Sequence, residues 1–263
     1  KKIILKYKPS IIVNYTAQGE VRNSWIHPDH WFKTNFEFVY KLSNFLVKKK
    51  FFKKFIHIST PEVYGSIDKK TNLSSIYNPS TPYAVSKSAG DLHLISIFKR
   101  YKFPVIFTRS TNVYGAGQQL FRIIPKSIIK IKKNEKIILN NFGNTKRDFI
   151  HVSDVAKFTL NCIKKGKIGS IYHCSSLRPP IRISKLVRII CQIKKIKFKK
   201  FVLFQKENYG QDNCYYIDSS KTVKTLQWKP KISLTEGIKD TMTWIDNNWS
   251  TIKKKNLNYK HLK

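Results

Sequence analysis

Acidic residues are scarce in this chain. It has 15 Asp and Glu against 51 Lys and Arg among 263 residues, so its formal net charge is +36. Only 8 of the basic residues are Arg, and the lysines are scattered over the whole length. A nucleic-acid surface concentrates its charge on one face and uses Arg to hold phosphates and base edges. We therefore interpret the excess as a bias of coding composition and predict no specific nucleic-acid partner.

Cysteines are few and long apolar stretches are missing. The four cysteines show neither C-x-x-C spacing nor the dense pattern of a disulfide framework, which favours a reducing compartment. No apolar run approaches the length that spans a membrane, and the basic first nine residues contain no continuous apolar segment of a signal peptide. We predict a cytoplasmic protein without a membrane partner. The spacing of His27 and His30 occurs in some metal sites, but no partner cluster accompanies it, so no metal is predicted.

Apolar periodicity predicts an α/β fold. With 41% hydrophobic residues the chain can bury a sizeable core. Short β-branched or aromatic runs at 11–15, 55–58 and 105–108 are typical of strands covered on both faces. Between them, apolar residues in 32–46 recur with helical spacing, which predicts a helix. A second helix is predicted to begin at Pro82, and 59–81 is predicted to be a loop. Alternating strands and helices predict a parallel, helix-covered sheet.

After Gly115 the predicted helices and strands become shorter. Helices are predicted near 121–131 and from Ser153, Ser184 and Ser233, where Ser233 and Glu236 form a capping box. Strands are predicted near 136–139 and 171–173. No internal repeat and no long linker separates this half from the first. We expect a second, smaller α+β lobe.

A tyrosine and a lysine with catalytic potential lie four residues apart on the helix that opens at Pro82. Tyr83 and Lys87 share one face of that helix, and an ammonium beside a phenol favours the phenolate. The spacing alone is weak, because Tyr259 and Lys263 repeat it in the tail. The preceding strand ends where ligands of parallel sheets usually bind, and a carboxylate follows there at Glu62. Acids are scarce here, so Glu62 is a site candidate rather than a surface carboxylate.

Six ordered blocks make the sequence recognisable. They are NYTA (14–17), TN (34–35), STPEVYG (59–65), PSTPYAVSK (79–87), TRSTNVYG (108–115) and RDFIHVSDV (147–155), followed by LQWKP (226–230) and SLTEGI (233–238). Together they resemble the extended short-chain dehydrogenase/reductases, and within them the nucleotide-sugar dehydratases of the dTDP-glucose 4,6-dehydratase type. The likeness extends over nearly the whole chain.

The resemblance implies a catalytic role for each of four residues. Tyr83 would take the proton of the sugar 4-hydroxyl while hydride passes to NAD, Lys87 would tune Tyr83 and bind the nicotinamide ribose, and Thr60 would bond the same oxygen. Glu62 would remove the C5 proton, after which water leaves from C6 and hydride returns there. The cofactor implied is NAD, which supplies the hydride chemistry.

The resemblance also implies binding residues, domains and a partner. The cofactor would be held by Ala17, Asn35, Ser59, Tyr83 and Lys87, and the nucleotide sugar by Asn112, Arg122 and Arg147. Residues 1–115, with 150–176, would form a partial Rossmann-type NAD-binding domain, and 116–149 with 177–263 the nucleotide-sugar lobe. The helices at 32–46 and 82–99 would pair with a second copy in a homodimer.

Departures from the pattern of the family keep other activities open. Dehydratases of the dTDP-glucose type usually carry Asp between the Thr and Glu, as the acid for the leaving C6 hydroxyl, and this chain has Pro61 there. Asn213 stands where an arginine often holds phosphate. A nucleotide-sugar epimerase or a UDP-glucuronate decarboxylase of the same fold therefore remains an alternative. An inactive remnant that binds polyanions through its lysines is a third.

The start of the chain also departs from the family. Family members open with a strand, a glycine-rich turn and a helix whose N-terminus binds the NAD pyrophosphate. That part is missing here, the chain begins at Lys1, and the single Gly-x-Gly, at Gly115 and Gly117, follows the third strand. Two βαβ units of about 30 residues each place roughly 60 residues before Lys1. We therefore expect an N-terminally truncated enzyme that binds NAD poorly as it stands.

The remaining histidines and tyrosines have structural interpretations. His57 and His173 lie on buried strands and are expected to be core histidines with satisfied hydrogen bonds. Tyr64 and Tyr114 each precede a glycine at a strand end and are expected to pack there.

Overall fold

The computed structural model describes residues 1–71, 76–207, 210 and 212–261. Its longer helices are α4 (Phe38–Leu46), α5 (Pro82–Tyr101), α6 (Ile123–Lys132), α7 (Val152–Lys165), α8 (Ile183–Ile193) and α11 (Leu234–Asn247). The shorter ones are α1 (Lys2–Tyr7), α2 (Val21–Ser24), α3 (Pro28–Phe32), α9 (Phe198–Phe201), α10 (Ser220–Leu226) and α12 (Trp249–Ile252). A π-helical turn (Lys33–Glu37) joins α3 to α4, and 3₁₀ turns lie at Pro61–Tyr64 and Asn140–Gly143.

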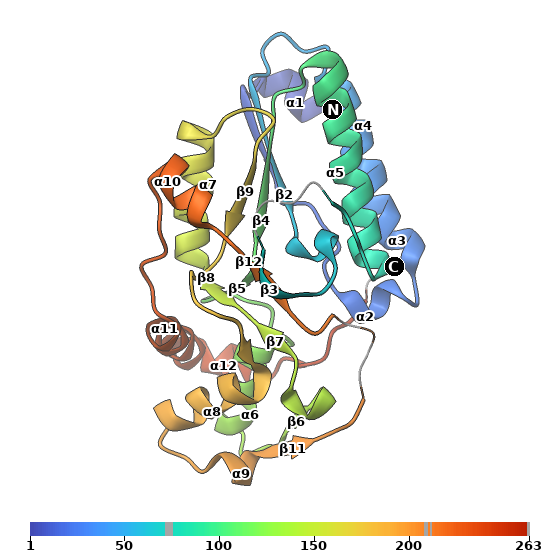
Figure 1. Cartoon of the computed structure of the whole chain (residues 1–263). Helices are drawn as coiled ribbons and strands as arrows, with labels where there is room; N and C mark the ends of the chain where they lie inside the picture. The colour runs from blue at the N-terminus through green and yellow to red at the C-terminus, as the bar shows by residue number, and fades with distance from the viewer. Residues whose placement is uncertain (72–75, 208–209, 211, 262–263) are drawn as a thin grey trace.

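The main sheet is parallel, as predicted. Its strand order is β1 (Ile11–Asn14), β2 (Lys54–Ser59), β4 (Val105–Ser110) and β9 (Ile171–Cys174). Helices α4 and α5 cover one face, and α7 and α10 cover the other (Figure 1). The fold is therefore the helix-covered, parallel α/β sheet that strand and helix periodicity indicated, and it agrees with the Rossmann-type fold that the resemblance implied.

Helices cover both faces of the sheet, so apolar side chains are needed on both faces of its strands. On β2, Phe55 packs toward α4 and α5, whereas its neighbour Ile56 packs on the opposite face with Phe158 of α7. Successive side chains of a strand point to opposite faces. A nearly continuous apolar run is therefore what a doubly covered strand requires.

Short two-stranded sheets connect distant parts of the chain. They are β10 (Ile181–Arg182) with β7 (Lys146–Arg147), β11 (Val202–Phe204) with β6 (Ile137–Leu139), β12 (Tyr215–Ile217) with β3 (Ile67–Thr71), and β5 (Asn112–Tyr114) with β8 (Phe149–His151). Strand β3 falls in the segment expected to be a loop, residues 59–81. Its partner β12 lies far away in the sequence, so local periodicity carries no signal for the pairing.

The second half of the chain builds its own core below the sheet (Figure 1). Ile128 of α6, Leu186 and Ile190 of α8, and Ile238 of α11 are buried together in it. The predicted capping box at Ser233 and Glu236 is present and begins α11. Leu226 and Trp228, by contrast, pack with the core of the main sheet. The chain thus returns to the sheet through α10 before it enters the lobe again.

Candidate active site

The candidate site lies at the carboxyl end of β2 and the N-terminus of α5. Proline opens both turns that flank it, because its missing N–H is not needed in a first helical turn. Thr60 caps the 3₁₀ turn that begins at Pro61, and its Oγ1 accepts a hydrogen bond from Glu62 N at 3.3 Å. Thr81 caps α5 in the same way, accepting from Ala84 N at 3.1 Å. These two caps fix how Glu62 and the first turn of α5 enter the site.

Tyr83 and Lys87 are both buried on α5, with 9% and 2% of their surface exposed. The Lys87 ammonium donates a 2.7 Å hydrogen bond to the carbonyl oxygen of Ile58, at the end of β2. Burial lowers the pKa of Lys87 to about 8, although the nearby carboxylate of Asp91 acts to raise it. Burial and the neighbouring charge of Glu62 raise the pKa of Tyr83, whereas a hydrogen bond with the Thr60 side chain lowers it. Thr60, Glu62, Tyr83 and Lys87 therefore share one site.

Glu62 is a half-buried carboxyl that faces this site. Burial raises its pKa from the ordinary value of 4.5 to about 7, against the opposing effect of the positive charge of Arg147. Among the residues that the structure describes, its buried Oε2 has no hydrogen-bond partner. A carboxyl with a pKa near neutrality and one free oxygen can both take and return a proton.

The predicted cofactor residues differ in what their side chains do. Ala17 is exposed in the loop after β1. Asn35 is fully buried and bonds within the protein: its Oδ1 accepts from Gln18 N at 2.8 Å, and its Nδ2 donates to Gln18 O and to Ser86 Oγ. Asn35 thus fixes the loop that contains Ala17.

Ser59 is the last predicted cofactor residue, and its hydroxyl is also engaged inside the protein. Its Oγ donates to Asp91 Oδ2 at 2.7 Å. Its single donor is therefore taken, and only its acceptor capacity is left. The cofactor roles of Ala17, Asn35 and Ser59 remain predictions.

The predicted substrate residues lie around the same edge but in different settings. Arg147 is buried and donates to the carbonyl oxygens of Lys146, Asp212 and Asn213, at 2.8, 2.8 and 3.2 Å. It therefore holds the segment in which Asn213 replaces an expected arginine, while its charge acts on Glu62.

Arg122 and Asn112 are more accessible than Arg147. Arg122 is half-buried and donates from Nη2 to the carbonyl oxygen of Gly19 at 3.2 Å, which links the start of α6 to the loop after β1. Asn112 is exposed on β5. Their binding roles also remain predictions.

A buried polar cluster next to the site was not foreseen. Arg109 Nη2 contacts Asp91 Oδ2 at 2.8 Å, and both side chains are fully buried. The guanidinium lies over the rings of Tyr64 and Tyr77, with its central carbon 4.5 and 5.0 Å from their centroids. One signal for this cluster was present in the sequence: Asp91, a rare acid, lies four residues after Lys87 on the same helix.

The structural interpretations of Tyr64, Tyr114 and His173 are confirmed. His57 is buried as expected, but its Nε2 has no hydrogen-bond partner among the described residues, although it lies 3.2 Å from Asp91 Oδ1. His57 and His173 are buried on β2 and β9, and burial lowers the pKa of both, that of His173 to about 4. Tyr64 is buried and bonds to His173 Nε2 at 2.8 Å. Tyr114 is buried at the end of β5.

The described part of the chain contains no group of three or more His, Cys, Asp and Glu side chains that could hold a metal ion. All four cysteines are free and buried.

No helix in residues 1–71, 76–207, 210 and 212–261 is long and apolar enough to cross a lipid bilayer.

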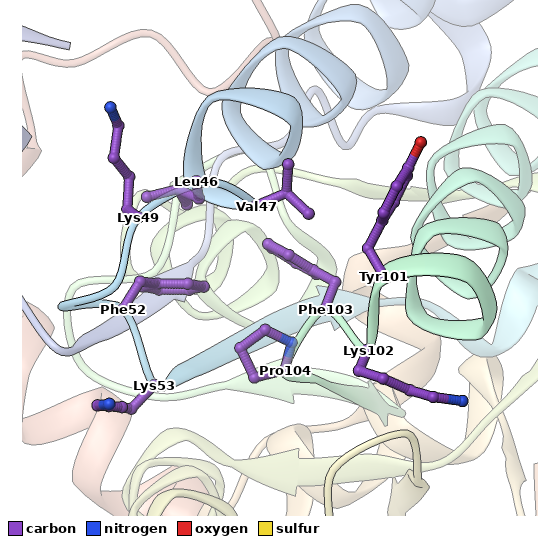
Figure 2. A pocket seen from close by; sticks show the side chains of 9 residues that line it. All are labelled: Leu46, Val47, Lys49, Phe52, Lys53, Tyr101, Lys102, Phe103 and Pro104. Carbon is purple, nitrogen blue, oxygen red and sulfur yellow. The ribbon is translucent and has the colours of Figure 1, made fainter.

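A pocket of about 260 Å³ lies at the other end of the sheet (Figure 2). It is lined by Leu46, Val47, Lys49, Phe52, Lys53, Tyr101, Lys102, Phe103 and Pro104. In Figure 2 the rings of Phe52 and Phe103 lie between Leu46 and Val47 on one side and Pro104 on the other, and the lysine side chains point away from them. These residues end α4 and α5 and precede β2 and β4, so the pocket is at the amino edge of the strands. Ligands of parallel sheets bind at the carboxyl edge, where Tyr83 lies.

Sequence comparison finds relatives over nearly the whole chain. The human dTDP-D-glucose 4,6-dehydratase is 32% identical over 256 residues, which cover 94% of this chain and 72% of the human protein. The dTDP-glucose 4,6-dehydratase of Haemophilus influenzae is 30% identical over 267 residues, covering 93% of this chain and 78% of that protein.

Comparison with solved structures finds enzymes of the same kind as the sequence comparison. The dTDP-glucose 4,6-dehydratase DesIV from Streptomyces venezuelae, solved with NAD and TYD bound, superposes with a TM-score of 0.87 at 26% identity, covering 92% of this chain and 75% of that one. A UDP-glucuronic acid 4-epimerase from Bacillus cereus shares the fold, with a TM-score of 0.85 at 24% identity over 94% of this chain and 77% of that one. Residues 1–175 match the NAD dependent epimerase/dehydratase family. The chain therefore belongs to the NAD dependent epimerase/dehydratase family.

Proposed function

We propose that this chain is a nucleotide-sugar 4,6-dehydratase that uses NAD and acts on dTDP-glucose. The observation that carries the proposal is the meeting of Tyr83, Lys87, Thr60 and Glu62 at the carboxyl edge of the sheet, with Glu62 acting electrostatically on Tyr83. The human and Haemophilus influenzae relatives bear the name of that activity. Oxidation at C4 requires a base for the sugar hydroxyl. The elimination that follows requires a second base for a carbon-bound proton.

The residues present fit a bound nicotinamide ribose. An ammonium has three N–H donors, and in the described part of the chain Lys87 gives one of them to Ile58 O. The other two suit the hydroxyls of a ribose. The chemistry that bound NAD supplies is acceptance of hydride from the sugar C4 and its return at C6.

The first step belongs to Tyr83. Its phenol is protonated in the resting protein, so Tyr83 first gives its own proton to solvent. The phenolate then takes the proton of the sugar 4-hydroxyl as C4 is oxidised, and the Lys87 ammonium stabilises this phenolate electrostatically. Thr60 can hydrogen-bond the same oxygen, because its side chain is already within bonding reach of the phenol. The result is a 4-keto sugar whose C5 proton is acidic.

The second step belongs to Glu62, whose pKa of about 7 leaves it partly ionised at neutral pH. Its carboxylate takes the C5 proton, and the electrons of that C–H bond form the C5–C6 double bond as the C6–O bond breaks. Pro61 has no proton to give to the leaving oxygen. Glu62 can return the proton it has just taken, so that water forms and the carboxylate is regenerated. When hydride returns to C6, C5 takes up a proton from solvent and Tyr83 releases the proton it holds, so that the phenolate is regenerated as well.

The substrate lies between the sheet and the lobe in this proposal. Arg122 and Arg147 supply positive charge for the diphosphate, and Asn112 supplies an amide. Residues 1–115 with 150–176 form the NAD-binding unit in this proposal, and 116–149 with 177–263 form the nucleotide-sugar lobe, except that α10 and Trp228 pack on the main sheet. The four free cysteines are compatible with a cytoplasmic location.

A homodimer through α4 and α5 is also part of the proposal. Phe38 on α4 is 41% exposed, and Val85 and Leu92 on α5 are 39% and 50% exposed. Light scattering tests it: Leu92→Lys should yield monomers, whereas Leu160→Lys, on exposed α7 surface of the other layer, should leave the dimer intact. A wild-type chain that is monomeric at all concentrations would contradict this part.

The experiment that tests the activity is incubation of the chain with NAD and dTDP-glucose, followed by mass spectrometry. Loss of one water, with a 4-keto-6-deoxy product, supports the dehydratase. A product of unchanged mass but inverted configuration, or carbon dioxide released from UDP-glucuronate, would replace the dehydratase with the epimerase or the decarboxylase. No turnover of any of these substrates, together with salt-sensitive binding to polyanions of any sequence, would identify the chain as an inactive binding protein.

A further inference from the structure

Asp91 is a fully buried carboxylate on the same helical face as the site. It lies four residues after Lys87 and eight after Tyr83 on α5, so the three side chains follow one another along the helix. None of its surface is exposed. A buried carboxylate is costly unless charges and hydrogen bonds stabilise it, and Asp91 has both.

The two oxygens of Asp91 connect α5 to two strands. Oδ2 accepts from Ser59 Oγ of β2 at 2.7 Å and from Arg109 Nη2 of β4 at 2.8 Å. Oδ1 lies 3.2 Å from His57 Nε2, also on β2. Arg109 and His57 hold the pKa of Asp91 below its usual range, so the group is a carboxylate at neutral pH.

Lys87 completes the same connection. It donates to the carbonyl oxygen of Ile58, which lies between His57 and Ser59. Two residues one helical turn apart on α5 thus hold three consecutive residues at the end of β2. The next residue in the chain is Thr60, which bonds toward Tyr83, so this attachment sets the distance between the strand end and the phenol.

Of the described titratable groups around Lys87 in the core, Asp91 is the one that carries a negative charge. On β2, His57 is kept neutral by burial, and on β4 Arg109 carries a positive charge that is paired with Asp91. The phenols of Tyr77 and Tyr83 have raised pKa values and are uncharged in the resting protein. Burial alone acts to remove the Lys87 proton, and the charge of Asp91 acts to keep it.

We propose that Asp91 is a positioning residue for the Tyr83 and Lys87 pair: it holds α5 against the end of β2 and keeps Lys87 in the ammonium form that supports the Tyr83 phenolate. The proposal rests on the proposed function in so far as Tyr83 acts as the base. The attachment and the charge state of Lys87 can be tested without turnover.

The first test is the pH dependence of kcat and kcat/KM in Asp91→Asn. Loss of the negative charge should move the alkaline limb of the profile to lower pH by about one unit, because a nearby opposite charge changes a pKa by that order. At neutral pH kcat should fall far more than KM rises. Asp246→Asn, a partly exposed carboxylate on α11, is the matched control and should leave the limb in place.

A second variant separates the effect on Lys87 from loss of the fold. Asp91→Asn leaves Arg109 buried without its partner, which is strongly destabilising, whereas replacing both members of a buried pair is often tolerated. Asp91→Asn/Arg109→Met should therefore fold and show the same direction of shift. An alkaline limb unchanged in both variants would overturn the proposal.

The second test measures the protonation of Lys87 directly. Urea unfolding of the wild type and of Lys87→Met is compared across a range of pH. The folded pKa of Lys87 is about 8 and its ordinary value is 10.5, so between these values the unfolded chain binds more protons. The free energy of unfolding of the wild type should then rise with pH relative to Lys87→Met in that window.

The same comparison in the Asp91→Asn/Arg109→Met background should show the rise beginning at lower pH. A rise that begins at the same pH with and without Asp91, or a wild-type Lys87 already neutral at pH 7, would overturn the proposal. If the wild type converts no sugar nucleotide while the unfolding data show the expected shift, the proposed function fails and the role of Asp91 in holding the Lys87 proton stands.

Discussion

Gly90 allows helix α5 to approach the main chain of Asn35. A Cβ on Gly90 would lie 2.7 Å from the carbonyl oxygen of Asn35, inside the π-helical turn before α4. At this separation the Asn35 side chain reaches both Ser86 of α5 and Gln18 of the loop after β1. One missing methyl group thus determines how the helix that carries Tyr83 packs beside the predicted cofactor loop.

Gly90→Ala should destabilise the protein. An alanine in a helix normally stabilises by about 1 kcal/mol relative to glycine. Here the added methyl would overlap a backbone oxygen, so we expect a net loss of about 1–3 kcal/mol. Urea unfolding measures it, with exposed Ser96→Ala on the same helix as the control, expected to change stability by less than about 0.5 kcal/mol. A more stable Gly90→Ala protein would show that α5 and Asn35 are not in close contact.

Tyr83→Phe should abolish most of the activity without affecting the fold. Loss of a general base costs about 10²–10⁴-fold in rate. Conversion of dTDP-glucose by the variant and by Tyr101→Phe measures the loss, since Tyr101 is exposed at the far end of α5 and should behave as wild type. Equal rates in the wild type and in Tyr83→Phe would remove Tyr83 from the chemistry.

Glu62→Gln should change the pH dependence of stability. The folded pKa of Glu62, about 7, is above its ordinary value of 4.5, so between these values the folded state binds more protons. The free energy of unfolding of the wild type therefore falls as pH rises through this window, and Glu62→Gln lacks that fall. Relative to the wild type, the variant should be increasingly stable from about pH 4.5 to about pH 7.

Denaturant unfolding at several pH values checks this, with exposed Glu135→Gln as the control. A constant difference between Glu62→Gln and the wild type would mean that Glu62 has an ordinary pKa. The same variant should also be unable to complete the elimination, since an amide cannot take the C5 proton.

Arg122→Met should weaken substrate binding more than it slows the reaction. Arg122 is half-buried and bonds only to Gly19 O and Gln119 Oε1 within the described chain, so it is accessible to a diphosphate. Loss of a charge-assisted hydrogen bond at a partly exposed position should raise KM about tenfold with kcat nearly unchanged. Steady-state kinetics with Arg100→Met as the exposed control measures the effect. A fall in kcat at constant KM would instead place Arg122 at the reacting atoms.

The helix and strand pattern followed from the sequence because its signals are local. Pro82 predicts the start of α5, and the spacing of Tyr83 and Lys87 predicts that these two residues share one face of it. The β-branched run at 11–15 predicts β1 in the same way. The 59–81 segment was predicted less well, since β3 forms only by pairing with β12, and a pairing over that distance leaves no periodic trace.

The sequence by itself determined the parallel α/β fold and the family, and it predicted the four residues of the candidate site, because strand and helix periodicity and short motifs are properties of neighbouring residues. Tertiary structure decided how those residues are set up for chemistry. Folding brings Asp91 to Arg109 and Arg147 to the neighbourhood of Glu62, and it directs the Asn35 side chain to Gln18 and Ser86 rather than leaving it free. Charges and hydrogen bonds act over a few ångströms of space, whatever the distance along the chain, so only the packed molecule fixes their partners.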